Sequence, residues 1–194
     1  GLKQMPVIEQ TALQMAEGRI LDVGAGSGCH SLALQEMNKE VCAIDISALS
    51  VEVMKKRGVK DARLVNLFDA TFHEQFDTIL LLMNGSGIIG KIENLPIFFQ
   101  TMKRLLRPGG CILMDSSDLR YLFEEEDGSY VIDLAGDYYG EIDFLMQYKD
   151  IKGDTFDWLY IDFQTLSLYA SEFGFQTELI KEGKHYDYLA KLTI

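Results

Sequence analysis

The sequence predicts a doubly wound α/β domain, in which a mostly parallel sheet carries helices on both faces. Strand-like apolar runs alternate with segments of helical spacing along most of the chain. A glycine-rich turn at Gly24, Gly26 and Gly28 follows the first of these runs and precedes a helix. The fourth run, residues 76–83, is apolar on both faces, which is typical of the centre of a parallel sheet.

The first part of the chain supplies the elements of this sheet. A helix is expected over residues 6–17, with Pro6 in its first turn and Gly18 at its end. A second helix follows the glycine turn to about Asn38, and Ser47 can cap a third helix. The expected strands of this part span residues 19–23, 41–45, 62–67, 76–83 and 111–114.

A further helix begins at about Leu95, between the fourth and fifth strands, and the sequence Arg107-Pro108-Gly109-Gly110 breaks it. Residues 141–148 and 156–163 alternate apolar and polar side chains around a turn at residues 152–154, so we expect an antiparallel hairpin inserted after the fifth strand. One more helix and a final antiparallel pair follow, at residues 175–180 and 186–192.

Composition and charge exclude several classes of function. We expect one cytoplasmic domain over residues 1–194, because no apolar run approaches the roughly 20 residues that cross a bilayer and no signal peptide is visible. The net charge of −12 argues against non-specific binding to nucleic acid and against an anionic membrane surface. Gly1 stands only a few residues before the first helix, which suggests that a preceding segment is absent. Three cysteines without metal spacing, expected as buried reduced thiols, are Cys29, Cys42 and Cys111.

The glycine turn has details that favour a cationic cofactor over a dinucleotide. Cys29 occupies the position where the dinucleotide fingerprint has its third glycine. Asp22 places a carboxylate two residues before the turn, which suits a cofactor that carries a sulfonium and an ammonium group. Asp45 ends the second strand, 21 residues after Gly24, where a carboxylate can bind both ribose hydroxyls of either cofactor type.

Residues 20–28, Ile-Leu-Asp-Val-Gly-Ala-Gly-Ser-Gly, resemble the first motif of class I S-adenosylmethionine (SAM)-dependent methyltransferases. Asp45 matches the ribose-binding acidic residue of that family. Residues 106–110, just before the fifth strand, also resemble the corresponding segment of the family. The resemblance implies a seven-stranded sheet with six parallel strands and an antiparallel last strand, SAM as cofactor and S-adenosylhomocysteine (SAH) as product. The cofactor-binding residues that we predict are Asp22, Gly24, Ala25, Gly26, Ser27, Gly28, Asp45, Ile46, Asn66, Leu67, Phe68 and Asn84, with residues 66–68 near the adenine and Asn84 near the methionine part or the substrate.

The chain departs from several subgroups of this family. Residues 84–87 read Asn-Gly-Ser-Gly, without the double proline that is associated with methylation of base nitrogens or glutamine amides. No cysteine stands where cytosine-C5 enzymes place their nucleophile, and no cluster of Asp and Asn residues indicates a catechol-type metal site. We therefore expect no metal and no nucleic-acid substrate.

The predicted reaction is direct methyl transfer from SAM to an N, O or S nucleophile of a small molecule or of an unidentified protein group. Residues 118–150 contain ten acidic and two basic residues, and we expect segment 118–163 to cover the cleft and to attract a cationic or amine substrate. The candidate substrate residues are Ser86, Asp118, Tyr138 and Tyr139.

Other interpretations of the same residues stay open at this point. The domain could bind SAM as an interaction or regulatory module without transferring methyl, or it could be an NAD(P)-dependent oxidoreductase. The glycine turn could be structural only, Asp45 a helix cap, Phe68 a core residue and the acidic stretch a solvated face. For His30 and His185, a packed or solvated side chain is favoured over a catalytic one.

Overall fold

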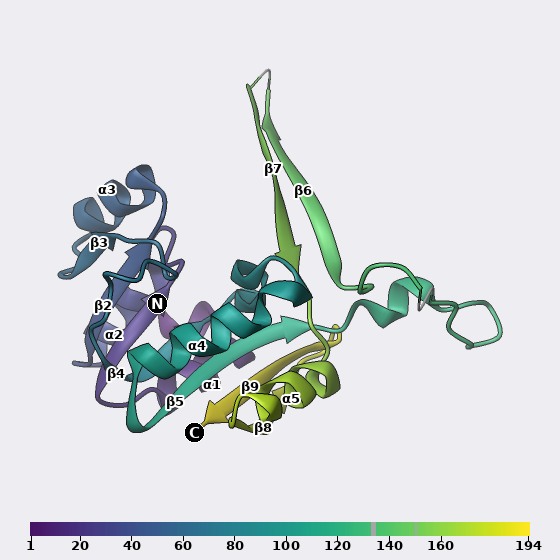
Figure 1. Cartoon of the computed structure of the whole chain (residues 1–194). Coiled ribbons are helices and arrows are strands. Elements are labelled where there is room, and N and C mark those ends of the chain that lie inside the picture. The colour runs from purple at the N-terminus through teal and green to yellow at the C-terminus, as the bar shows by residue number, and fades with distance from the viewer. Residues whose placement is uncertain (133–134, 150) are drawn as a thin grey trace.

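The computed structural model describes residues 1–132, 135–149 and 151–194. A seven-stranded sheet in the order β3-β2-β1-β4-β5-β9-β8 forms the centre of the molecule (Figure 1). Neighbouring strands from β3 to β5 are parallel, and β9 runs antiparallel to both β5 and β8, which confirms the predicted mixed sheet. The strands of this sheet are Arg19–Val23 (β1), Glu40–Asp45 (β2), Ala62–Leu64 (β3), Phe76–Leu81 (β4), Leu106–Ser117 (β5), Gln176–Glu182 (β8) and Asp187–Thr193 (β9).

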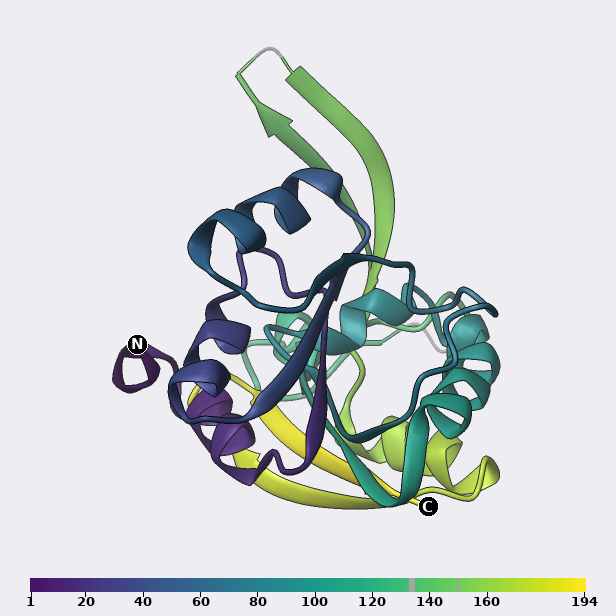
Figure 2. The same ribbon diagram turned by 90° about the vertical axis from the view of Figure 1, so that its left-hand side faces the viewer.

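Helices cover both faces of the sheet, as Figures 1 and 2 show from two directions. Helices α1, α2 and α3 pack on one face through small and aliphatic side chains, whereas α4 and α5 cover the other. The second interface is rich in aromatic residues, with Phe98 and Phe99 fully buried beside Phe76. The α-helices are Val7–Met15 (α1), Cys29–Glu36 (α2), Ala48–Arg57 (α3), Leu95–Leu105 (α4) and Phe163–Glu172 (α5).

Three strands differ in length from the prediction by two residues or more. β4 ends at Leu81 because Met83 and Asn84 take positive φ angles of 66° and 56°, which a strand cannot contain. β3 is also shorter than predicted and ends at Leu64. β5 is longer, because it pairs with β4 from Leu106 and with β9 as far as Ser117. Residues 107–110 interrupt the pairing with β4, but they do not end the strand.

The predicted hairpin is present as a separate two-stranded sheet that projects from the body (Figure 1). Its strands are β6, Glu141–Tyr148, and β7, Ile151–Leu159, so the predicted turn at residues 152–154 is wrong. Gly153 lies instead within β7, where the register shifts between the pairs Leu145–Thr155 and Gln147–Lys152. A glycine inside a strand often marks such a bulge, and here the pattern of a turn and that of a bulge look alike in sequence.

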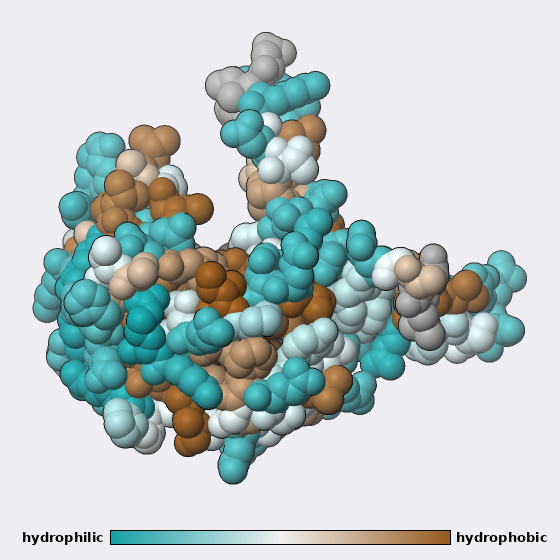
Figure 3. Space-filling model, viewed as in Figure 1, coloured by the Kyte–Doolittle hydropathy of each residue, from teal (hydrophilic) through white to brown (hydrophobic). Residues whose placement is uncertain are grey.

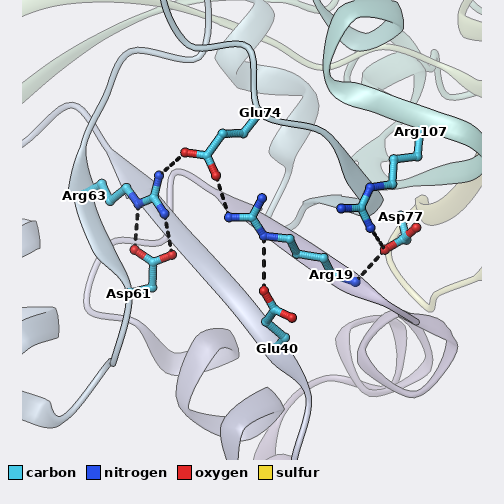
Figure 4. Close-up of polar contacts among 7 residues, drawn as sticks. All are labelled: Arg19, Glu40, Asp61, Arg63, Glu74, Asp77 and Arg107. Atoms are coloured by element: carbon cyan, nitrogen blue, oxygen red, sulfur yellow. Dashed lines mark hydrogen bonds and ion pairs between the residues drawn. The ribbon is translucent and has the colours of Figure 1, made fainter.

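Ion pairs tie the N-terminal ends of the strands together on the edge of the sheet opposite the glycine turn (Figure 4). Glu74 bridges the guanidinium groups of Arg19 and Arg63. Asp77 accepts hydrogen bonds from the Arg19 backbone N–H at 2.7 Å and from Arg107 Nη1 at 2.8 Å. These side chains are partly exposed, so the cluster fixes the positions of strand ends more than it adds to stability.

Within the described part of the chain, none of the helices has the length and apolar character that crossing a membrane would require.

Candidate active site

A cavity of about 820 Å³ opens at the C-terminal ends of β1, β2 and β4. The strand order reverses between β1 and β4, and ligands of open α/β sheets bind in the crevice at this point. Figure 3 shows the surface hollowed between α3 and the hairpin, and the lining residues come from both sides of this hollow. The predicted cofactor residues that line the cavity are Asp22, Gly24, Ala25, Gly26, Ser27, Asp45, Ile46, Asn66, Leu67 and Phe68.

The glycine turn folds over one end of the cavity. Gly24 and Gly26 have φ angles of 65° and 55°, which residues with a Cβ rarely adopt, so the turn depends on glycine at these positions. Gly28 does not line the cavity, contrary to the prediction. It packs against α3 and the segment after it, and a Cβ there would lie 2.7 Å from Val59 Cγ2. Its role is close helix packing.

Asp22 is the last residue but one of β1 and lies buried beneath the turn. Its side chain is 1% exposed, and Oδ2 accepts a hydrogen bond from Ser31 Oγ at 2.6 Å. Burial raises the pKa of Asp22, although the nearby His30 and the Ser31 hydroxyl favour its ionised form. A buried carboxylate with one hydroxyl donor in the protein is suited to pair with a cation that enters the cavity.

Asp45 joins the turn to the start of α3. Its Oδ2 accepts the Gly26 N–H at 2.9 Å, and its Oδ1 accepts the Ser47 N–H at 2.8 Å. Ser47 is the residue that caps α3, because its Oγ accepts from the Ser50 N–H at 3.3 Å. The carboxylate of Asp45 therefore holds the turn against β2 while one side of it faces the cavity.

The segment after β3 forms the next wall. Leu67 is 3% exposed and belongs to the main core, while Phe68 is half-buried against that core. The Asn66 side chain accepts the Phe68 N–H at 3.0 Å, which fixes this short turn at the cavity.

A buried carboxylate organises the loop after β4. Asp115, on β5, accepts the Gly85 N–H through Oδ1 at 2.9 Å and the Met83 N–H through Oδ2 at 3.2 Å. These bonds hold the positive-φ residues Met83 and Asn84 in place, and Met83 and Gly85 line the cavity. Burial raises the pKa of Asp115 to about 6, although its backbone donors favour the ionised form.

The pKa of Asp115 predicts a pH dependence of stability. The folded protein keeps a proton on Asp115 up to about pH 6, whereas the unfolded chain releases it near pH 4. The stability that this group contributes is therefore full below about pH 4 and is lost as the pH rises through 6, by up to about 3 kcal/mol. Denaturant unfolding between pH 4 and 7 should show this slope in the wild type and a smaller slope in Asp115→Asn. Equal slopes in the two proteins would contradict the assignment, and Glu126→Gln, at an exposed site, serves as control.

The hairpin forms the wall opposite the glycine turn. Phe156, Asp157 and Trp158 of β7 line the cavity. The indole of Trp158 lies directly on Gly87, since a Cβ at Gly87 would be 1.8 Å from the ring. Asp157 stands opposite Asp143 of β6, and a hydrogen bond between these two carboxyl groups raises the pKa of Asp157. The wall thus combines aromatic surface with carboxylates.

Comparison with known proteins agrees with this geometry. Residues 21–114 match the family model of a methyltransferase domain. A SAM-dependent methyltransferase from Bacteroides fragilis, solved in complex with SAH, is 76% identical with a TM-score of 0.93, over 99% of this chain and 78% of that chain. The chain belongs to the class I SAM-dependent methyltransferases. SAM is accordingly the cofactor of this methyltransferase, in agreement with the prediction, and the oxidoreductase alternative is set aside.

Two curated relatives are more distant. The cypemycin N-terminal methyltransferase of a Streptomyces species is 33% identical over 106 residues, which are 53% of this chain and 43% of that enzyme. An uncharacterized methyltransferase from Staphylococcus carnosus is 27% identical over 169 residues, which are 87% of this chain and 75% of that protein. The matched region thus spans less than half the length of the Streptomyces enzyme.

The residues predicted to contact substrate lie elsewhere in the methyltransferase. Ser86 is fully buried, and its hydroxyl donates to the Leu159 carbonyl at 2.8 Å, which ties the loop after β4 to the hairpin. Asn84 does not line the cavity either, because its Oδ1 accepts from Ser117 Oγ at 2.7 Å. Both side chains hold the walls of the cavity together rather than face a ligand in it.

The other three candidates form a cluster around the N-cap of α5. Tyr138 donates to Asp162 at 2.7 Å, and Tyr139 donates to Asp118 at 2.8 Å. Asp118 and Asp162 line a second cavity of about 600 Å³ between the end of β5 and the β8–β9 turn. The predicted contact of Asp118, Tyr138 and Tyr139 with the main cavity is therefore not found.

Segment 118–163 is divided between two places. Residues 156–158 of the hairpin, beyond the acidic run 118–150, line the main cavity, whereas residues 124–127 are exposed on a loop that projects from the end of β5, away from α3 (Figure 1). Asp133 and Asp150, which contribute to the acidic count, lie outside the described residues. The expectation that this run of carboxylates covers the cavity is not met by residues 124–127.

Several lining residues were not predicted. Cys29 is exposed at the rim, contrary to the expectation of a buried thiol, and hydrogen bonds with Ser27 and Arg57 lower its pKa. Cys42 is buried as expected, and burial raises its pKa to about 12.

His30 lines the cavity from the first turn of α2. The aromatic residues Phe156 and Trp158, at alternate positions of a strand that stands away from the main sheet, were the signal in the sequence that could have indicated a binding wall.

Proposed function

We propose that this methyltransferase transfers the methyl group of SAM to a nucleophile of a small molecule, and that this molecule is an amine that attacks through its neutral nitrogen or a substrate that carries a cationic group beside its nucleophile. The observation that carries the proposal is the single cavity that joins the glycine turn and Asp45 to the hairpin wall of Phe156, Asp157 and Trp158. One side of this cavity has the residues suited to SAM, and the other supplies the surface for an acceptor.

In this proposal the cofactor lies along the C-terminal ends of the strands. Asp45 accepts hydrogen bonds from the ribose hydroxyls, and residues 66–68 contact the adenine ring, with Phe68 offering its aromatic face. Asp22 faces the cationic end of the cofactor. The exposed loop residue Ile46 closes the outer side of the adenosine site.

For this reaction the protein mainly has to position the nucleophile and the methyl group of SAM. The sulfonium is a good leaving group, so the nucleophile attacks the methyl carbon in line with the departing sulfur and SAH is released. The walls hold the two reactants in this geometry and exclude water. A neutral amine needs no general base to attack, whereas a protonated amine must first lose a proton.

The charges on the hairpin support an amine acceptor. Asp157 lines the cavity and stands opposite Asp143, and this neighbouring carboxyl group raises the pKa of Asp157. A cationic group placed there would relieve the repulsion between the two carboxyl groups. Phe156 and Trp158 alternate with Asp157 along β7 and line the cavity with aromatic rings that attract cations. The printed name of the Streptomyces relative, an N-terminal methyltransferase, also refers to an amine acceptor.

The proposal predicts which acceptors are methylated. With tritiated SAM, a panel of amines should give labelled product, and hydroxyl or thiol analogues of the same shape should give at least tenfold less. Asp157→Asn should raise KM for the amine several-fold in a way that depends on salt. Glu125→Gln, on the projecting loop outside the cavity, is the matched control and should change little. Preferential labelling of the hydroxyl or thiol analogues would refute the amine assignment, and absence of SAM binding would refute the whole function.

A further inference from the structure

A buried acid–base pair forms part of the cavity wall next to Asp22. His30, on the first turn of α2, is 6% exposed, and Glu9, on α1, is 9% exposed. Nε2 of His30 lies 2.6 Å from Oε2 of Glu9. Burying two such groups is costly unless they are paired, and here each supplies the partner of the other.

The second ring nitrogen of His30 has no hydrogen-bond partner among the residues that the structure describes. The hydrogen bond to Glu9 uses Nε2, and Nδ1 makes none with any described residue. In the described part of the chain, every side-chain nitrogen or oxygen that is sealed from solvent has a partner, so Nδ1 must reach accessible space. Because His30 lines the main cavity, that space is the cavity.

The charges around His30 favour its cationic form. Burial opposes protonation, but the hydrogen bond that His30 donates to Glu9 and the charge of Asp22 on β1 outweigh burial, and the pKa of His30 is raised. Cys29, on the same helix, acts in the same direction. Among the described residues that line the cavity there are three carboxylates and no lysine or arginine, so His30 is the basic side chain available there.

SAM brings both signs of charge into this cavity. Its methionine part carries an ammonium group beside a carboxylate, and the sulfonium adds a second positive charge. The acidic side chains of the wall can match the cations. A carboxylate placed in the same cavity needs a donor, preferably a charged one, since an unpaired buried anion is strongly disfavoured.

We propose that His30, held in its imidazolium form by Glu9, donates a hydrogen bond from Nδ1–H to the carboxylate of the methionine part of SAM, while Asp22 faces the ammonium group. The proposal rests on the cavity being the SAM site and is independent of the acceptor. In it, His30 is a binding residue, and Glu9 is a positioning residue that acts through His30.

Two ligands that differ by one carboxylate test the proposal. SAH carries the group, and decarboxylated SAH, S-adenosyl-3-thiopropylamine, lacks it but keeps the ammonium. His30→Gln is the informative variant, because its amide can still donate to Glu9 while the donor at the Nδ1 position is removed. Calorimetric titration should show that the variant binds SAH about 10- to 100-fold more weakly than wild type and binds decarboxylated SAH within about threefold of wild type.

Matched controls separate the possible results. His73→Gln replaces an exposed histidine outside the cavity and should leave both affinities unchanged. Equal losses for both ligands in His30→Gln, or no loss for either, would overturn the proposal. If wild type bound neither SAM nor SAH, the proposed function itself would fail, which is a different result from a variant that does not discriminate between the ligands.

The pH profile tests the role of Glu9. The imidazolium contributes to SAH binding at low pH, and this contribution is lost as the pH rises through the pKa of His30. Glu9→Gln removes the charge that favours the imidazolium, so the fall in SAH affinity should move to lower pH, whereas decarboxylated SAH should show no such fall. A purely structural Glu9 would weaken both ligands at every pH.

An experiment on the wild type keeps the test valid even if a variant does not fold. The chain has three histidines, so the imidazole protons can be followed by NMR. Saturation with SAH should raise the pKa of one buried histidine, and saturation with decarboxylated SAH should not. A pKa of His30 that falls or stays constant with SAH would contradict the proposal.

Discussion

Replacing Asp45 with alanine is expected to weaken the binding of SAM and SAH by about 30- to 1,000-fold. In the proposed site its carboxylate accepts hydrogen bonds from two ribose hydroxyls, and hydrogen bonds to charged groups contribute about 1.5–3 kcal/mol each, less than additively when they share a group. Each 1.4 kcal/mol corresponds to about a tenfold change in affinity. Calorimetric titration with SAH measures the loss, and thermal unfolding shows that the fold survives.

The same substitution also frees the backbone N–H groups of Gly26 and Ser47, so part of the loss could come from the loosened turn. A ligand pair separates the two effects. If Asp45 binds the ribose, 5′-methylthioadenosine should lose more affinity in Asp45→Ala than its 2′-deoxy counterpart does. Asp69→Ala, at an exposed site, is the control. An unchanged affinity for SAH would show that the ribose lies elsewhere, and equal losses for the two nucleosides would assign Asp45 to the turn alone.

Gly87→Ala is expected to displace the hairpin wall and to lower kcat/KM for the acceptor about 10- to 100-fold. The new Cβ would lie 1.8 Å from the indole of Trp158, so the ring and the strand that carries it must move. Overpacking of this kind destabilises proteins by about 1–3 kcal/mol. A displacement of about 1 Å at a reaction centre can cost a hundredfold in rate.

Trp158 makes this displacement directly measurable. It is the one tryptophan of the chain, so its fluorescence should shift toward that of an exposed indole in Gly87→Ala. Gly153→Ala is the matched control, because its Cβ would lie no closer than 3.4 Å to any atom outside its immediate neighbours. Adding Trp158→Leu should reduce the loss of stability caused by Gly87→Ala. If the fluorescence and the unfolding free energy of Gly87→Ala both match wild type, then the hairpin does not rest on this loop.

Much of the fold could be predicted from local patterns. Residues 20–23 are apolar apart from Asp22, the turn after them needs positive φ angles, and the helix after that begins with Cys29. Each of these requirements is met within a few residues of chain, so a sequence records them directly. The number of strands in the sheet and the reversed last strand followed from the resemblance to a known family, whereas the order of the strands came from the structure.

Much of the cofactor side of the cavity was predictable for the same reason. Asp22 and Asp45 stand at the ends of neighbouring parallel strands, and parallel strands end at the same edge of a sheet. Their meeting at one cavity is therefore a consequence of β-strand geometry. The same reasoning was wrong for Gly28 and Asn84, because each contacts a residue that is distant in sequence instead of lining the cavity. Gly28 packs against Val59, and Asn84 accepts a hydrogen bond from Ser117.

The acceptor side depended on contacts that the sequence does not record. Phe156, Asp157 and Trp158 reach the cavity only because the hairpin docks on Gly87, some 70 residues earlier in the chain. Tyr138 and Tyr139 turn to Asp118 and Asp162 instead. Likewise, Glu9 and His30 are 21 residues apart and become a pair only when α1 packs beside α2.

The sequence by itself determined the glycine turn, the two carboxylates beside it and the order of most elements, because these features depend on local backbone preference and on the alternation of strands and helices. Only the tertiary structure decided which side chains face the cavity on its far wall and which histidine nitrogen stays free. Such choices depend on long-range packing, in which one glycine can admit an indole and one buried acid can hold an imidazole in place.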